Sequence, residues 1–179
     1  MSRKIILNSN QLDILINRLV CQLIENHDDF SNTVLIGLQP RGVYFLNKII
    51  SLLKNKYDCK SVSYGILDIT FFRDDFRRND KPLNPNISDM NVKIESKSVV
   101  LIDDVLYTGR SIRAALTAIE TYGRPKFIEL LILIDRRFSR ELPIQPNYIG
   151  LEVDSIQNDR VIVNWNENRN EDSVYLING

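Results

Sequence analysis

The chain alternates between short aliphatic runs and longer segments in which apolar residues recur every three to four positions. Aliphatic runs bounded by polar residues predict buried strands at residues 33–38, 98–102 and 127–134. The helical spacing predicts helices over residues 10–27, 42–53 and 111–122. Shorter apolar segments predict strands at residues 4–7 and 62–69, and edge strands of a small appended element at residues 161–163 and 174–177. Strands that alternate with helices favour an α/β fold, so we expect a mostly parallel central sheet flanked by helices.

Residues at the ends of two predicted helices carry further signals. Ser9 or Asn10 suits the N-cap of the first helix, because a short polar side chain can accept a hydrogen bond from the first turn. Gly123, with Pro125 beyond it, is expected to end the helix over residues 111–122.

Residues 69–97 interrupt this alternation with a long polar stretch. Its charged residues include Arg73, Asp74, Asp75, Arg77, Arg78, Asp80 and Lys81, and Pro82 and Pro85 follow. A segment of this length that buries little is usually functional when it lies inside a compact domain. Two interpretations stand, a solvated loop and a lid over a site. We expect Arg73 to contact a ligand, and Arg77 and Arg78 to remain solvated.

Composition narrows the class of protein. The 179 residues are 44% hydrophobic and 26% charged, as in an ordinary globular domain. The 23 Lys and Arg residues balance the 23 Asp and Glu residues, so the formal net charge is zero. This balance argues against binding nucleic acid by bulk electrostatics, and it leaves room for a local basic patch.

Few residues are available for nucleophilic or metal chemistry. Cys21 and Cys59 have neither CxxC spacing nor the number for a disulfide framework. His27, the only histidine, stands beside two aspartates at a predicted helix end, and we interpret it as a solvated structural residue. The sequence shows no signal-peptide core and no apolar stretch of membrane-spanning length, so we expect a cytoplasmic protein without a membrane partner.

An acidic pair, Asp103 and Asp104, follows the predicted strand at residues 98–102. In parallel sheets ligands bind beyond the carboxyl ends of the strands. Carboxylate oxygens at such a position suit Mg²⁺ or sugar hydroxyls. Residues 107–111 then supply Thr, Gly and Ser before a helix, whose N–H groups and dipole favour a phosphate. Together these features predict a site for a ribose next to a phosphate.

Other interpretations of the acidic pair fit less well. A strand-end cap would not require the loop that follows, and the acidic pair of a receiver domain would follow the first strand of the chain. The sequence contains neither GxxxxGK[ST] nor GxGxxG, so it lacks the signatures of a Walker loop and of a dinucleotide site.

Residues 103–111, Asp-Asp-Val-Leu-Tyr-Thr-Gly-Arg-Ser, resemble the phosphoribosyl pyrophosphate (PRPP) motif of type I phosphoribosyltransferases. They are most similar to the family of bifunctional pyrimidine-operon regulators and uracil phosphoribosyltransferases. Further matching segments follow in the same order over roughly residues 5–150, at residues 37–42, 68–75, 123–125, 134–136, 140–144 and 148–150. The resemblance implies a type I phosphoribosyltransferase fold in one domain, residues 1–179, with a mobile lid loop at about 69–97. It also implies a small hood at about 135–179 that includes the N-terminal strand.

The resemblance further implies that the protein forms UMP and pyrophosphate from uracil and PRPP, with Mg²⁺ as cofactor. Asp103 and Asp104 would contact the ribose hydroxyls or hold Mg²⁺, directly or through PRPP or water. Arg41 would bind the pyrophosphate, and Arg73 would close over it, which completes the implied catalytic set. The implied substrate-binding residues are Gln39, Pro40, Arg41, Gly42, Asp103, Asp104, Val105, Leu106, Tyr107, Thr108, Gly109, Arg110, Ser111, Ile134, Asp135 and Arg136.

The pyrophosphate loop of type I enzymes often contains a non-proline cis peptide bond. The corresponding bond here is Gln39–Pro40. A cis bond before proline costs only ~0.5–1 kcal/mol, against ~3–4 kcal/mol before other residues. We therefore expect this bond to be cis.

Departures from the family concern the base and RNA. In the hood, residues 137–139 replace a shorter segment, which affects base specificity. On the first helix Arg18 is retained, whereas the residues that differ from the regulators are Asn17, Cys21 and Asn26, with Leu151 further along. A basic patch could still form from Arg124, Lys126, Arg136, Arg137 and Arg140. The excess of acidic residues in 151–179 opposes RNA binding.

Three functions therefore stand at this point. The first is a uracil phosphoribosyltransferase with weak or absent RNA regulation. The second is a UMP-responsive regulator that binds a messenger-RNA leader of pyrimidine genes. The third is a phosphoribosyltransferase for another base, such as hypoxanthine. The resemblance also implies a homodimer or a higher homo-oligomer.

Overall fold

The computed structural model describes residues 3–74, 87–156, 158–165, 171–177 and 179. Most of the predicted polar loop, including Arg77 and Arg78, lies outside the described residues, so its lid role stays a prediction. Within the described residues, no helix is long and apolar enough to cross a membrane.

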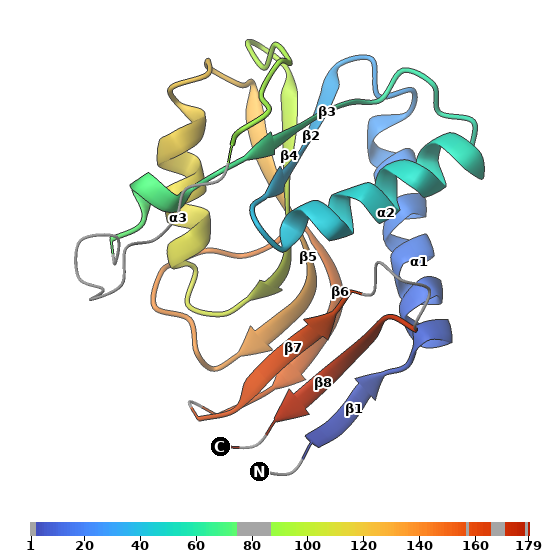
Figure 1. Cartoon of the computed structure of the whole chain (residues 1–179). Helices are drawn as coiled ribbons and strands as arrows, with labels where there is room; N and C mark the ends of the chain where they lie inside the picture. The colour runs from blue at the N-terminus through green and yellow to red at the C-terminus, as the bar shows by residue number, and fades with distance from the viewer. Residues whose placement is uncertain (1–2, 75–86, 157, 166–170, 178) are drawn as a thin grey trace.

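A five-stranded parallel sheet forms the centre of the molecule (Figure 1). Its strands lie in the order β3 (Ser63–Leu67), β2 (Thr33–Leu38), β4 (Ser98–Leu106), β5 (Phe127–Arg137) and β6 (Tyr148–Asp154). All four neighbouring pairs are parallel. Near-continuous aliphatic runs fit β2, β4 and β5 because helices cover both of their faces.

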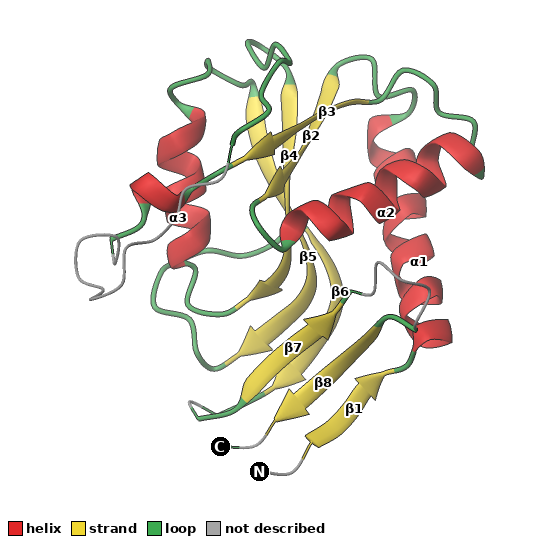
Figure 2. Ribbon diagram, viewed as in Figure 1, coloured by secondary structure: helices red, strands yellow, loops and turns green. Residues whose placement is uncertain are grey.

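Three helices cover this sheet (Figure 2). The helices α1 (Ser9–His27) and α2 (Gly42–Asn55) pack on one face, against the side chains of Leu35 and Val100. The helix α3 (Arg110–Ile119) packs on the other face, against Val34 and Val99. Neighbouring residues of one strand thus enter different hydrophobic clusters, because side chains alternate across a strand.

A second, antiparallel sheet of three strands contains the first and the last strand of the described chain. Its order is β1 (Arg3–Leu7), β8 (Ser173–Ile177) and β7 (Arg160–Asn164). Leu7, Val163 and Val174 are buried and join the same cluster as α1 and α2. The expectation that residues 174–177 form an edge strand is wrong, since β8 pairs on both sides.

Each predicted helix and strand is present in the structure, but several ends differ and one strand has no predicted counterpart. Asn8 is the N-cap of α1, instead of Ser9 or Asn10, because Asn8 and Gln11 exchange side-chain to backbone hydrogen bonds of 3.0 Å each. The helix α3 ends at Ile119, before Gly123. Strand β6 was not predicted as a strand, because polar residues interrupt its apolar positions, and pairing with β5 stabilises it.

A short 3₁₀ helix, η1 (Thr70–Phe72), follows β3 and precedes the undescribed residues of the polar loop. The side chain of Asp68 holds its start, since one carboxylate oxygen accepts hydrogen bonds from the Thr70 N–H at 3.0 Å and hydroxyl at 2.6 Å. This turn brings Arg73 and Asp74 to the carboxyl end of the sheet, beside α3.

Candidate active site

A cavity of about 410 Å³ lies between the end of β4 and the start of α3. It is lined by Arg73, Asp74, Asp103, Val105, Leu106, Tyr107, Thr108, Gly109, Arg110, Ser111 and Ile112. The loop at residues 107–109 turns sharply enough for α3 to begin directly behind the acidic pair. Gly109 allows this turn, since its φ is +91° and an added Cβ would lie 3.2 Å from Ile144 Cδ1.

The acidic pair lies within β4, which extends past the aliphatic run to Leu106. Asp104 is 3% exposed, and its Oδ2 accepts a hydrogen bond of 2.8 Å from Arg41 Nε. Asp103 Oδ1 accepts one of 2.9 Å from the Asp104 backbone N–H. Burial and the charge of Asp104 raise the pKa of Asp103 to about 8. Burial also raises the pKa of Asp104, and the guanidinium of Arg41 opposes this change.

A second cavity, of about 270 Å³, adjoins the first. Its lining residues are Gln39, Pro40, Arg41, Ile69, Arg73, Asp103, Asp104, Val105, Ser111 and Val161. The Gln39–Pro40 bond is cis, as the sequence predicts. Gly42 is in close contact with β4, because an added Cβ would lie 2.4 Å from the Ile102 carbonyl oxygen. The pyrophosphate-type loop and the acidic pair thus form one continuous site.

Arg41 and Arg73 give this site positive charge. Arg41 donates hydrogen bonds to Asp104 and to the Val163 carbonyl of β7, which joins the three-stranded sheet to the site. Arg73 lines both cavities, and its charge acts to lower the pKa of Asp103. The structure therefore brings together the four predicted catalytic residues, whose roles stay predictions.

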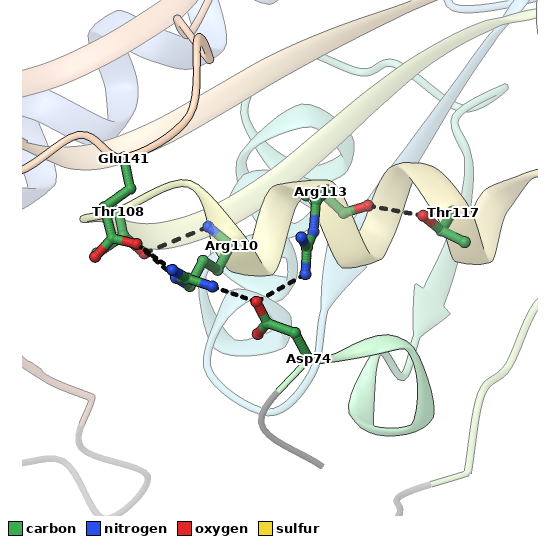
Figure 3. Close-up of polar contacts among 6 residues, drawn as sticks. All are labelled: Asp74, Thr108, Arg110, Arg113, Thr117 and Glu141. Atoms are coloured by element: carbon green, nitrogen blue, oxygen red, sulfur yellow. Dashed lines mark hydrogen bonds and ion pairs between the residues drawn. The ribbon is translucent and has the colours of Figure 1, made fainter. Parts of the chain in front are cut away.

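The predicted phosphate loop meets the loop that follows β5. The Thr108 carbonyl accepts hydrogen bonds from the backbone N–H groups of Glu141 at 3.0 Å and Leu142 at 3.3 Å. The side chain of Arg110 is held by Glu141 and Asp74 (Figure 3). Sequence reasoning missed Glu141 and Arg113, because these partners lie 31 and 39 residues from the groups they contact and have no local signal.

Three of the predicted substrate-binding residues, Ile134, Asp135 and Arg136, do not line either cavity. Ile134 is fully buried, and Asp135 is ion-paired with Arg140. Arg136 is 6% exposed, and its guanidinium lies 3.9 Å from the centre of the Tyr107 ring. It also donates hydrogen bonds to Ser155 and to the Asp159 carbonyl. Through these contacts Arg136 packs against Tyr107 of the phosphate-type loop. A direct role of these residues in substrate binding stays a prediction.

The five cations proposed for a basic patch do not gather in one place. Arg124 and Lys126 precede β5, whereas Arg137 is its last residue and Arg140 follows it, and a strand of this length spans roughly 33 Å. Arg136 is buried, and Arg137 is ion-paired with Asp154 at 2.5 Å. The hypothesis of a single patch is therefore wrong. On α1, Arg18 donates hydrogen bonds to the carbonyls of Ile149 and Gly150, so it braces β6.

His27 is not solvated, which corrects the sequence-based interpretation. Its side chain is 5% exposed, and its Nε2 lies 3.0 Å from Glu129 Oε2 and 3.1 Å from the Tyr148 hydroxyl. Its Nδ1 lies 3.1 Å from the Thr33 hydroxyl. Burial lowers the pKa of His27, and the Glu129 carboxylate opposes this change. Residues near the starts of β2, β5 and β6 contact His27 at the C-terminal end of α1. Helical periodicity in the sequence cannot reveal such contacts.

Comparison with known proteins establishes the family. Residues 2–168 match the phosphoribosyl transferase domain, and the chain belongs to this family. It is 41% identical over 172 residues to the bifunctional protein PyrR of Microcystis aeruginosa, with 96% of each chain covered. It is 36% identical over 179 residues to the bifunctional protein pyrR of Enterococcus faecalis, with 100% of this chain and 99% of that protein covered. The resemblance to bifunctional type I phosphoribosyltransferases is thereby confirmed.

Solved structures show the same fold. A hypoxanthine phosphoribosyltransferase of Trypanosoma cruzi matches with a TM-score of 0.72 at 16% identity, over 98% of this chain and 96% of that one. One from Staphylococcus aureus matches with a TM-score of 0.66 at 18% identity, over 86% and 79%. At these identities the likeness concerns the fold alone, and it confirms the predicted α/β architecture with a parallel sheet flanked by helices.

Proposed function

We propose that the protein is a uracil phosphoribosyltransferase that forms UMP and pyrophosphate from uracil and PRPP with Mg²⁺. One observation carries the proposal. Asp103 and the phosphate-type loop line one cavity, and the adjoining one is lined by both members of the acidic pair together with Arg41 and Arg73. Two anion-binding regions thus flank a pair of carboxylates, which is the arrangement that a ribose with a phosphate at each end requires.

The reaction displaces pyrophosphate from C1 of the ribose. The C1–O bond breaks and its electron pair leaves with the pyrophosphate, while a uracil ring nitrogen forms the new bond to C1 and releases its proton. Positive charge develops on the ribose ring and negative charge on the leaving group. Arg41 and Arg73 stabilise the leaving group, and Asp103 and Asp104 orient the ribose hydroxyls. The backbone N–H groups at the start of α3 hold the 5′-phosphate.

The donor set of the site fits Mg²⁺. No group of three acidic, histidine or cysteine side chains suited to a metal occurs among the described residues. Mg²⁺ in phosphate-handling sites is commonly held by one or two carboxylates together with substrate phosphates and water. Asp103 and Asp104 would supply these carboxylates. When bound, the ion would offset the charge that develops on the leaving pyrophosphate.

Base recognition is the finer part of the proposal. Backbone groups near Ile134, Asp135 and Arg136 would read the pyrimidine edge, since the side chains of Asp135 and Arg136 are engaged elsewhere. These side chains contribute by holding Arg140 and Tyr107 in place. As the family resemblance implies, we expect uracil to be the preferred base.

Transfer of label from uracil to UMP, in the presence of PRPP and Mg²⁺, tests the proposed reaction. We expect UMP and an equal amount of pyrophosphate, with hypoxanthine and guanine reacting much more slowly. A preference for a purine base would replace uracil with that base. Failure with every base would reject the enzymatic proposal.

A second candidate function is RNA-binding regulation, which the resemblance to the family of bifunctional pyrimidine-operon regulators favours. The separated cations and the acidic C-terminal region speak against tight binding. Filter binding of a pyrimidine leader RNA, with and without UMP, separates the two functions. We expect weak binding without a response to UMP, and submicromolar UMP-dependent binding would establish the regulator.

The proposed enzyme is a homodimer or a higher homo-oligomer. Large exposed apolar side chains favour self-association, and Phe71 at 62% exposure and Phe127 at 45% are examples. Light scattering coupled to gel filtration gives the mass in solution. A monomer at the concentration of the enzyme assay would contradict this part of the proposal.

A further inference from the structure

Asp74 forms a bridge between the 3₁₀ turn η1 and the first turns of α3 (Figure 3). Its Oδ2 accepts a charged hydrogen bond from Arg110 Nη1 and lies 2.9 Å from Arg113 Nη2. The two arginines are three residues apart, so they lie on one face of the helix. Burial acts to raise the pKa of Asp74, but the bonds and charges of these arginines outweigh it and hold the pKa below its usual value.

Glu141 fixes the direction of Arg110 from the opposite side. Its Oε2 accepts hydrogen bonds from Arg110 Nε at 2.6 Å and lies 2.5 Å from Nη2. The backbone N–H of Glu141 is itself bonded to the Thr108 carbonyl at 3.0 Å. Because the guanidinium is a planar fork, engaging Nε and Nη2 leaves Nη1 directed toward Asp74. Glu141 therefore holds the Arg110 guanidinium in the orientation that the ion pair with Asp74 requires.

The position of Asp74 needs an explanation, because its carboxylate lines the cavity that would receive a phosphate. By electrostatics alone, a negative charge there weakens the binding of an anionic substrate. Its chain neighbour Arg73 lines both cavities and acts on Asp103. The bridge by Asp74 holds the backbone of Arg73 against α3, within reach of the site.

We propose that Asp74 is a positioning residue that places Arg73 at the pyrophosphate side of the site through its ion pairs with Arg110 and Arg113. The inference rests on the proposed phosphoribosyltransferase function, and it assigns the Arg110 side chain to the bridge. The 5′-phosphate then relies on the backbone of the loop at residues 108–111.

The kinetic test uses Asp74→Asn, Arg113→Gln and the double variant. We expect each single change to raise the KM for PRPP about two- to five-fold, the range of a partly exposed ion pair, with the KM for uracil little changed. The KM for PRPP of the double variant should not exceed that of the more strongly affected single variant, because both changes break the same bridge. Asp58→Asn is the matched control, since Asp58 is 79% exposed and lies outside the site.

The sign of the Asp74→Asn effect decides between positioning and simple electrostatics. An unchanged or lower KM for PRPP in this variant would overturn the proposal. A structural readout is amide hydrogen exchange in the peptide that covers residues 70–74, which should speed up in Asp74→Asn and Arg113→Gln and stay unchanged in Asp58→Asn. Unchanged exchange in the first two would also overturn it. An inactive wild type would reject the proposed function instead, and the exchange data would still decide whether Asp74 anchors this segment.

Discussion

The two ends of the five-stranded sheet both contain a buried polar cluster, but the clusters differ in kind. At the amino end, His27, Thr33, Glu129 and Tyr148 lie within hydrogen-bonding distance of one another. At the carboxyl end, Asp103 and Asp104 lie side by side, with Arg41 bonded to one of them. The amino end thus places its one carboxylate beside an imidazole and a hydroxyl, whereas the carboxyl end concentrates like charges beside two cavities.

This difference shows what marks a functional site. Buried polar groups are normally hydrogen-bonded, so a satisfied cluster needs no ligand to explain it. Two adjacent carboxylates repel each other, and burial increases the cost of charging them. A cluster of this kind is stabilised when a ligand supplies hydroxyl groups or a cation. The changes below should therefore affect catalysis when they lie at the carboxyl end, and stability without catalysis when they lie at the amino end.

The largest effect is expected for Asp103→Asn at the carboxyl end. Loss of the carboxyl group that would orient the ribose hydroxyls or hold Mg²⁺ should lower kcat/KM for PRPP about a hundred-fold or more. Stability should change little, since asparagine keeps the size and the oxygen that bonds to the Asp104 N–H. Steady-state kinetics and thermal unfolding measure both. The counterpart Glu129→Gln should leave turnover within about two-fold, and an equal loss there would erase the contrast between the ends.

The next effect is expected for Gly42→Ala, which tests the contact between the Arg41 loop and β4. The new methyl group would meet the Ile102 carbonyl oxygen at 2.4 Å and force the backbones apart. We expect a loss of about 1–3 kcal/mol in the free energy of unfolding and a raised KM for PRPP. Denaturant titration and kinetics check this prediction. Wild-type values for both would mean that the loop tolerates displacement.

At the amino end, Tyr148→Phe should reduce stability without affecting catalysis. The hydroxyl accepts a hydrogen bond from Asn26 and donates one to Glu129, each at 3.1 Å. Removing it takes a hydrogen bond from each of two partly buried groups, which costs about 1–2 kcal/mol and lowers the Tm by about 2–8 °C. Calorimetry measures this change. A reduced kcat at full folding would show that the amino end communicates with the site.

The smallest effect concerns the pH dependence of stability at the same cluster. Because burial lowers the pKa of His27, the unfolded chain binds a proton more readily than the folded protein. The contribution of the neutral imidazole is therefore fully present above about pH 6.5 and is lost as the pH falls below that value. His27→Gln should flatten the decline in unfolding free energy between about pH 7 and 5. Parallel profiles for the two proteins would exclude this role.

Sequence reasoning performed best where local pattern and tertiary structure agree. The strand Thr33–Leu38 has the predicted bounds because helices bury both of its faces. The acidic pair and the loop at residues 108–111 lie together because they are adjacent in the chain. Strand β6 and the environment of His27 were missed because their partners lie far away in sequence.

The sequence by itself determined the α/β alternation, the acidic pair and the phosphate-type loop. These features depend on periodicity and on neighbours within a few residues. Only the tertiary structure decided which charges act together. It paired Arg41 with Asp104, separated Arg124 from Arg140, and placed Asp74 between two arginines of α3. The physical reason is that an ion pair depends on distance in space, which the packing of helices against the sheet sets.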